Sequence, residues 1–104
     1  MIGVLVFPDF QLLDAAGPIS VFEIAARFAG QFPSIKVFAV TSGPVRSSSG
    51  VEMMARGIKP YGAITSLLVA GGEGVEAAMR CEKTLNFVRA MAKRGVSGPN
   101  VVKA

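Results

Sequence analysis

The sequence feature that most constrains the fold is a short apolar run close to the amino terminus. Residues 2–7 read Ile-Gly-Val-Leu-Val-Phe and include no polar side chain. A strand with one solvated face alternates apolar and polar residues, whereas an unbroken run of this length is typical of a strand buried on both faces. Two further, mostly apolar runs lie at residues 35–41 and 64–70. Strands of this kind occur in parallel sheets covered by helices, so the chain is predicted to have an α/β fold.

The segments between these runs carry helical and hairpin patterns. Apolar residues at helical spacing predict a helix from about Gln11 to Gly30. Gly17-Pro18 interrupts that pattern, because proline lacks a backbone donor and disfavours helical geometry at the residue before it. A separate turn over Leu12–Gly17 is therefore expected, with the main helix starting near Pro18. Residues 45–54 are predicted to form a small hairpin or flap whose turn lies near Ser49-Gly50.

After the third apolar run, residues 75–80 are predicted to form a helical turn and residues 82–94 an amphipathic helix. The pattern fails beyond them: Val101-Val102 suit a strand, but Gly98-Pro99 interrupts it. The sequence thus predicts three parallel core strands with the first in the middle. The third strand is expected to have no fourth-strand neighbour, and its free edge is expected to invite pairing with another chain.

Composition narrows the class of protein. The 104 residues suffice for one small domain, and 51% of them are hydrophobic. The mean hydropathy of +0.50 is high for a small monomer, so we expect a homo-oligomer. No apolar run approaches the length of a membrane span, and the amino terminus has no signal-peptide pattern, which favours a cytoplasmic protein with no membrane partner.

The distribution of charge and the numbers of cysteine and histidine residues argue against several functions and sites. The net charge of +4 comes from basic residues scattered along the chain, whereas nucleic-acid binding usually needs a clustered patch, so no direct nucleic-acid binding is expected. There is one cysteine and no histidine. An internal disulfide, a Ser-His or Cys-His pair and a zinc site are therefore not expected, and we expect no metal and no cofactor.

Asp14 is the first candidate for a functional residue. It lies among apolar neighbours, and a carboxylate in such surroundings has to be paired, hydrogen-bonded or protonated. It also follows the carboxyl end of the first strand, where open α/β sheets place their ligands. We expect the carboxylate to be partly buried and to lie near the Gly71-Gly72 turn that follows the third strand.

Three other motifs are weaker candidates. Gly72-Glu73-Gly74 begins a match to the dinucleotide-binding fingerprint, but it follows the third strand and no acidic residue stands about 20 positions further on to hold a ribose, so a glycine turn is favoured. The serine run 47–49 suits an anion or, more simply, a polar turn. Cys81 has Arg80 and Lys83 nearby but no histidine partner, and is interpreted as a structural or idle cysteine.

Three separated motifs together carry a resemblance to a known family. Residues 6–18, Val-Phe-Pro-Asp-Phe-Gln-Leu-Leu-Asp-Ala-Ala-Gly-Pro, followed by Val21-Phe22-Glu23, resemble the PfpI/ThiJ superfamily, which has a class I glutamine amidotransferase-like fold. They look most similar to the branch found as the N-terminal domain of AraC-type transcriptional regulators. Residues 45–51 and 67–72 fall in the order and spacing of that branch. The resemblance covers about residues 2–95, and residues 96–104 form a divergent tail of the single partial domain 1–104.

The resemblance implies a flavodoxin-like three-layer sandwich with a parallel sheet, usually dimeric. In the enzymes of the superfamily an acidic residue from the first helix touches a cysteine on a sharp turn after the fourth strand, and Asp14 matches that acidic residue. Backbone amides at a Gly-Gly turn, here Gly71-Gly72, help to form a small-ligand or oxyanion pocket. Cys81 lies too early to match the family's cysteine. The chain therefore looks like the N-terminal part of such a domain, truncated before that turn.

Three functions remain open on this basis. The leading one is a truncated, non-catalytic ligand-sensing domain of an AraC-type regulator, with Asp14, Gly71 and Gly72 around an unknown small-molecule effector. The second is a fragment of an isocyanide hydratase-like or other PfpI/ThiJ-type enzyme, and the third is a dimerisation or interaction module. Because the family's nucleophile is missing, we expect no hydratase, amidase or protease activity from this chain.

Overall fold

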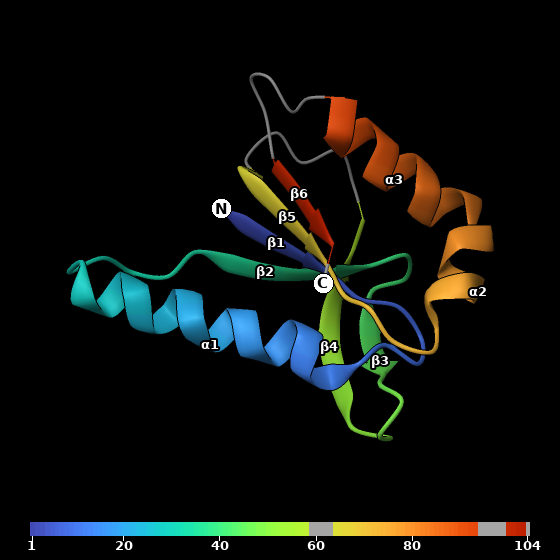
Figure 1. Cartoon of the computed structure of the whole chain (residues 1–104), viewed down its shortest axis with the longest axis horizontal. Coiled ribbons are helices and arrows are strands. Elements are labelled where there is room, and N and C mark those ends of the chain that lie inside the picture. Colours follow the sequence, from blue (N-terminus) through green and yellow to red (C-terminus); the bar gives the residue numbers. More distant parts are fainter. Residues whose placement is uncertain (59–63, 94–99, 104) are drawn as a thin grey trace.

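The computed structural model of the chain describes residues 1–58, 64–93 and 100–103. The strands are β1 (Ile2–Leu5), β2 (Ile35–Ala39), β3 (Gly43–Arg46), β4 (Glu52–Gly57), β5 (Ser66–Val69) and β6 (Asn100–Lys103). The helices are α1 (Leu12–Phe28), α2 (Val75–Arg80) and α3 (Glu82–Lys93). The six strands form a sheet in the order β3-β4-β2-β1-β5-β6 (Figure 1).

The first strand lies in the middle of the parallel core, as the sequence predicts. In register, Ile2 stands opposite Ile35 of β2 on one side and Ser66 of β5 on the other, and both pairings are parallel. The predicted hairpin is also confirmed, because β3 and β4 pair antiparallel. Strand β4 then runs parallel to β2, which attaches the hairpin to the sheet. The predicted α/β architecture with a parallel core is therefore confirmed.

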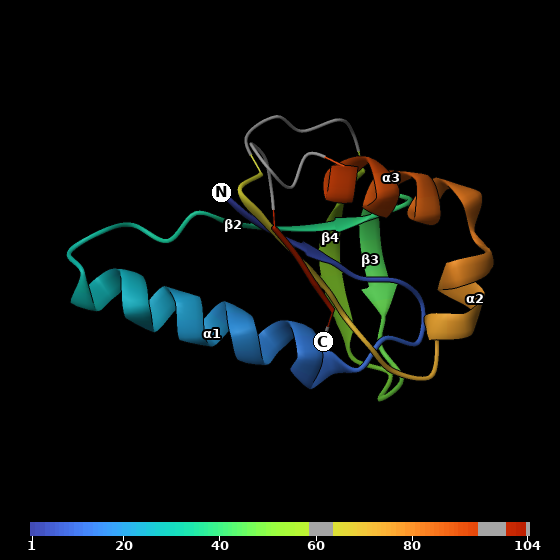
Figure 2. The same cartoon turned by 45° about the horizontal axis from the view of Figure 1, so that its top comes forward.

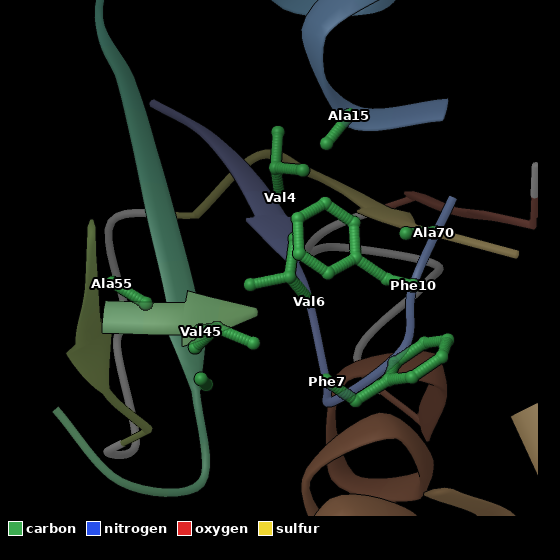
Figure 3. Packing of buried hydrophobic residues seen from close by; sticks show 9 residues of the cluster. Val4, Val6, Phe7, Phe10, Ala15, Val45, Ala55 and Ala70 are labelled. Carbon is green, nitrogen blue, oxygen red and sulfur yellow. The ribbon is translucent and has the colours of Figure 1, made fainter. Parts of the chain in front are cut away.

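Helices cover the two faces of the sheet. Helix α1 lies on one side, and α2 and α3 lie on the other (Figures 1 and 2). On the α1 side, Ala15 packs in one buried cluster with Val4, Val6 and Phe10 (Figure 3). On the opposite face, Phe87 and Met91 of α3 join a second cluster around Leu5, Phe38, Ile64 and Leu67. Alternate residues of β1 supply both clusters, which explains why this strand is apolar throughout.

The expectation of a separate turn before Pro18 is wrong. Helix α1 is continuous from Leu12 to Phe28 with Pro18 inside it. Glycine at position 17 has no Cβ, so the part of the proline clash that falls on the preceding side chain is absent. Proline also removes only one backbone hydrogen-bond donor from the helix. Ala15 before it and Ile19 after it both pack against the core, and this packing stabilises the helical turns on either side of Pro18.

The expectation that the third strand lacks a neighbour is also wrong. Strand β6 pairs parallel with β5, with Ser66 opposite Asn100 and Val69 opposite Lys103. The pairing of β6 with β5 begins at Asn100, one residue after Pro99, so it does not need the backbone N–H that proline lacks. The edge through which association was expected is therefore occupied by the chain itself. Across the described part of the chain, no helix has the length and apolar character needed to cross a membrane.

Candidate functional site at the carboxyl edge of the sheet

Backbone hydrogen bonds tie together the loops that follow β1, β3 and β5. The amide of Gln11 donates to the carbonyl oxygen of Gly71 at 2.9 Å, and the amide of Gly74 donates to that of Asp9 at 3.1 Å. The same loop is joined to the hairpin, because the amide of Asp9 donates to the carbonyl of Arg46 at 2.9 Å. These bonds place the start of α1 directly against the loop that leaves β5.

Two glycines make this close approach possible. A Cβ on Gly72, whose φ is +117°, would lie 2.5 Å from the backbone nitrogen of Gln11. A Cβ on Gly74 would lie 2.0 Å from the carbonyl oxygen of Pro8. Side chains are excluded at both positions by the backbone of the loop after β1. Gly72 and Gly74, which match part of the dinucleotide-binding fingerprint, therefore allow two backbone segments to pack closely. This is the glycine turn that the sequence favours over a nucleotide site.

Asp14 lies where the sequence predicts. Its Oδ2 accepts a hydrogen bond of 3.1 Å from the backbone amide of Gly71, and the contact is partly buried. The amide of Gly71 is therefore engaged by the chain's own carboxylate, and its carbonyl by Gln11. This differs from what the resemblance implies for the Gly-Gly turn, since the Gly71 amide would have to leave Asp14 before it could bind a ligand. The hydrogen bond to Asp14 thus connects the first turn of α1 to the loop after β5.

The second carboxylate oxygen of Asp14 is available to a ligand. Among the described residues no hydrogen bond to Oδ1 is found, and no fully buried side-chain oxygen or nitrogen there lacks a partner. Oδ1 therefore reaches open space. Asp14 borders a wide hollow of about 550 Å³, whose other lining residues are Leu13, Gly17, Pro18, Val21, Phe22 and Leu68. The carboxylate stands between β1 and β5, at the point where the strand order reverses and where doubly wound sheets bind ligands.

Cys81 lies in a different place from Asp14. It follows α2 directly and precedes α3, as a free cysteine. It borders a hollow of about 490 Å³ together with Asp9 and Thr84, and Asp14 does not line that hollow. The structure therefore does not bring the thiol and the Asp14 carboxylate together in one described cavity. This position between two helices agrees with the sequence, which predicts a helical turn at residues 75–80 and a separate helix at residues 82–94.

The surroundings of Cys81 favour its thiolate. A hydrogen bond from the Thr84 hydroxyl lowers the pKa of the Cys81 thiol below its ordinary value, and the backbone amides of Thr84 and Lys83 act in the same direction. A lower pKa raises the fraction of thiolate, the reactive form, at pH values below the ordinary titration range.

We expect the rate of Cys81 alkylation by iodoacetamide to rise at a lower pH than that of a free thiol, whose pKa is about 8.5. In Thr84→Val the hydroxyl is lost, so the midpoint of the rate profile should move to higher pH. Lys83→Gln serves as a control for the smaller charge effect and should move the midpoint less. A profile that is identical in wild type and Thr84→Val would contradict the assigned cause.

The serine run 47–49 forms hydrogen bonds within the hairpin turn. The hydroxyls of Ser47 and Ser49 lie 2.8 Å apart and hydrogen-bond to each other, and Ser49 Oγ accepts a bond from the amide of Val51. Ser47 is buried, so its hydroxyl stabilises the hairpin turn. Within residues 1–58, 64–93 and 100–103 there is no group of three acidic or sulfur side chains placed to hold a metal ion.

We compared the sequence and the fold of the chain with those of known proteins. No family model matches the chain. It is 33% identical over 94 residues to an isonitrile hydratase from Pseudomonas putida, a match that spans 88% of this chain and 38% of the relative. A ThiJ/PfpI family protein from Pseudomonas syringae superposes with a TM-score of 0.73 at 26% identity, covering 98% of this chain and 40% of that one.

An AraC family transcriptional regulator from Pseudomonas putida also shares the fold. Its TM-score is 0.58 at 18% identity, over 86% of this chain and 50% of the regulator. The chain thus spans half or less of the length of these three proteins. The predicted flavodoxin-like α/β fold is confirmed by these superpositions.

Proposed function

Because this chain belongs to the ThiJ/PfpI superfamily, we propose that it is a non-catalytic domain that senses a small molecule, of the kind carried by AraC-type regulators. The ligand site is formed by Asp14 and the Gly71-Gly72 turn. The single observation that carries the proposal is the Asp14 carboxylate, which accepts a hydrogen bond from Gly71 through Oδ2 and borders an apolar hollow, with no described hydrogen bond to Oδ1. DNA binding and a cytoplasmic location belong to the proposed regulator as a whole, with DNA contacted by another domain.

The absence of a nucleophile beside Asp14 supports sensing over catalysis. A covalent mechanism needs a nucleophile within hydrogen-bond reach of its acid or base partner. Apart from Asp14, the described lining of its hollow consists of apolar residues and glycine. The chain contains no histidine, and its one cysteine borders another hollow. A lone carboxylate used as a general acid or base contributes only about 10²- to 10⁴-fold to a rate.

The chemistry of the hollow defines the class of ligand. Leu13, Val21 and Leu68 offer apolar contact, and Oδ1 of Asp14 offers a hydrogen-bond acceptor. A small molecule with an N–H or O–H donor and a short apolar body satisfies both. A donor that also competes for Oδ2 releases the amide of Gly71, so occupation of the site is transmitted to the loop after β5.

We expect Asp14→Asn to weaken binding of such ligands by about 2- to 30-fold, because a hydrogen bond to a charged acceptor contributes about 1.5–3 kcal/mol and one to a neutral acceptor about 1 kcal/mol. The measurement is a titration of the ¹⁵N-labelled chain with a panel of small primary amides and alkylamines, following the amide signals of Gly71 and Gly72. The amide oxygen of asparagine can still accept the Gly71 bond, so the fold should persist.

Glu73→Gln is the matched control, since it neutralises an exposed carboxylate two residues beyond Gly71. It should leave the titration unchanged. If no compound in the panel shifts the two glycine signals, or if Asp14→Asn binds as well as wild type, Asp14 is not the ligand site.

The similarity to isonitrile hydratase favours an enzyme fragment as the second candidate. Its test is incubation of the purified chain with isonitriles, amides and peptides. We expect no turnover from the chain itself. Turnover that is lost in Asp14→Asn or Cys81→Ser would overturn the sensing proposal and make that residue catalytic.

A further inference from the structure

A further cavity lies between the helices α2 and α3 and the end of β5, on the face of the sheet away from α1 (Figure 2). We call it the α2–α3 cavity, and its volume is about 230 Å³. Val69 of β5 lines it, whereas the neighbouring Leu68 lines the hollow at Asp14. Successive side chains of a strand point to opposite faces. The α2–α3 cavity is therefore separate from the ligand site proposed above, and no described residue lines both.

The walls of the α2–α3 cavity are almost entirely apolar. Eight of its nine described lining residues have apolar side chains, and the ninth is Thr84 of α3. Phe7 and Ala70, which follow β1 and β5, are buried and lie at its inner end. Met79 of α2 also lines the cavity but is 54% exposed, so it stands at the mouth. A methionine side chain has three rotatable bonds, so Met79 can turn aside and admit a ligand.

Water is a poor occupant of such a cavity. A buried water molecule needs about two to four hydrogen-bond partners. Among the described lining residues, Thr84 has the only hydroxyl, and this hydroxyl already donates to the Cys81 thiol. Apolar walls that face an empty space lose dispersion contacts. An apolar molecule that enters the α2–α3 cavity restores those contacts and displaces little or no bound water.

We propose that the α2–α3 cavity binds a small aromatic molecule that carries one hydrogen-bond donor, such as a phenol. A dry apolar cavity of about 150 Å³ holds benzene, so a cavity of about 230 Å³ has room for a ring with a substituent. Phe7 offers an aromatic ring and Met79 a thioether, and both make favourable contacts with aromatic rings. The Thr84 oxygen can accept the hydrogen of the ligand while its own hydrogen stays on Cys81.

Two fluorinated probes test the proposal by NMR titration of the ¹⁵N-labelled chain. Fluorobenzene and 4-fluorophenol share the ring and differ in one hydroxyl. Both should shift the amide signals of Ala78, Leu85 and Val88, with dissociation constants on the order of 1 mM or below. The phenol should bind about 2- to 10-fold more tightly, which is the net effect of one added hydrogen bond. Thr84→Val should abolish that difference and leave the affinity for fluorobenzene unchanged, because only the hydroxyl is lost.

Filling the cavity tests its location. Ala78→Leu on α2 and Val88→Phe on α3 place additional carbon atoms in the space that the ring would occupy. Each should weaken binding of both probes by about tenfold or more. The two variants start from different helices because overpacking can destabilise a core, and the dispersion of the amide spectrum identifies a folded variant. Ala90→Leu is the matched control and should bind like wild type, since Ala90 is exposed on α3 and is not among the described lining residues.

The same titrations can overturn the proposal. No shift of the α2 and α3 signals with either probe up to about 5 mM, or unchanged binding by a folded filling variant, would exclude the site. Shifts confined to Val21 and Leu68, or loss of binding in Asp14→Asn, would place the probes in the hollow at Asp14 instead. Equal affinities of the two probes for the wild-type chain would contradict the donor and with it the class of ligand. Because the signals lie on α2 and α3, the result does not depend on the proposed function.

Discussion

Gly74→Ala is expected to remove a large part of the folding stability of the chain. The new Cβ would lie 2.0 Å from the carbonyl oxygen of Pro8 and 3.2 Å from the carbonyl carbon of Asp9, so backbone rather than a flexible side chain would have to move. Movement of that loop breaks the hydrogen bond from the Gly74 amide to Asp9. We expect a loss of about 4 kcal/mol or more, out of about 5–15 kcal/mol for a domain of this size.

The measurement is urea unfolding followed by circular dichroism. Gly57→Ala, at the end of β4, is the control, because a Cβ there would meet its nearest atom at an ordinary contact distance of 3.7 Å. Its stability should change by no more than about 0.5 kcal/mol. If Gly74→Ala unfolds within about 1 kcal/mol of wild type, the two loops do not pack as closely as described.

Gly72→Ala is expected to have the second largest effect, with two separate causes. A φ of +117° is strained for any residue with a side chain, at a cost of about 1–3 kcal/mol. In addition, the Cβ would lie 2.5 Å from the backbone nitrogen of Gln11. The amide of Gln11 donates to Gly71, so relief of the clash disturbs the hydrogen bond between Gly71 and Asp14 as well. We expect a total loss of about 3–5 kcal/mol.

Gly50→Ala separates the two causes. Gly50 also has a positive φ, of +90°, but the nearest atom to its Cβ would be the Nη2 of Arg46 at 3.6 Å. This variant should therefore show the conformational strain alone, about 1–3 kcal/mol. Equal losses in Gly50→Ala and Gly72→Ala, measured by the same urea titration, would show that contact with Gln11 contributes nothing.

The parts of the fold that depend on local pattern were predictable from the sequence. Residues 2–7 have no polar member, and such a run fits the central strand because both of its faces are covered. The Asp14 carboxylate could also be placed, since the loops after parallel strands meet at one edge of a sheet. Its partner at Gly71 then follows from the order of the strands, because β5 lies next to β1.

The parts that depend on tertiary contact were not predictable. Pro18 stays inside α1 because the core holds the turns before and after it, and local propensity carries no information about that packing. Strand β6 pairs with β5 over only four residues. Val101-Val102 suit a strand, but Gly98-Pro99 stands directly before it, and local pattern does not show that the pairing begins after that proline. The exposure of Leu13, Val21 and Phe28 on α1 was missed because apolar residues at helical spacing predict a buried face equally well.

The frame around Asp14 is built almost entirely from main-chain atoms, and this has an evolutionary consequence. Peptide groups make the bonds from Gln11 to Gly71, from Gly74 to Asp9 and from Asp9 to Arg46, and every amino acid except proline offers the same groups. The exposed side chains above the frame are therefore free to drift while the carboxylate keeps its place. The same backbone frame can in this way persist while the sequence around it changes, which agrees with a ThiJ/PfpI family protein that superposes with a TM-score of 0.73 at 26% identity.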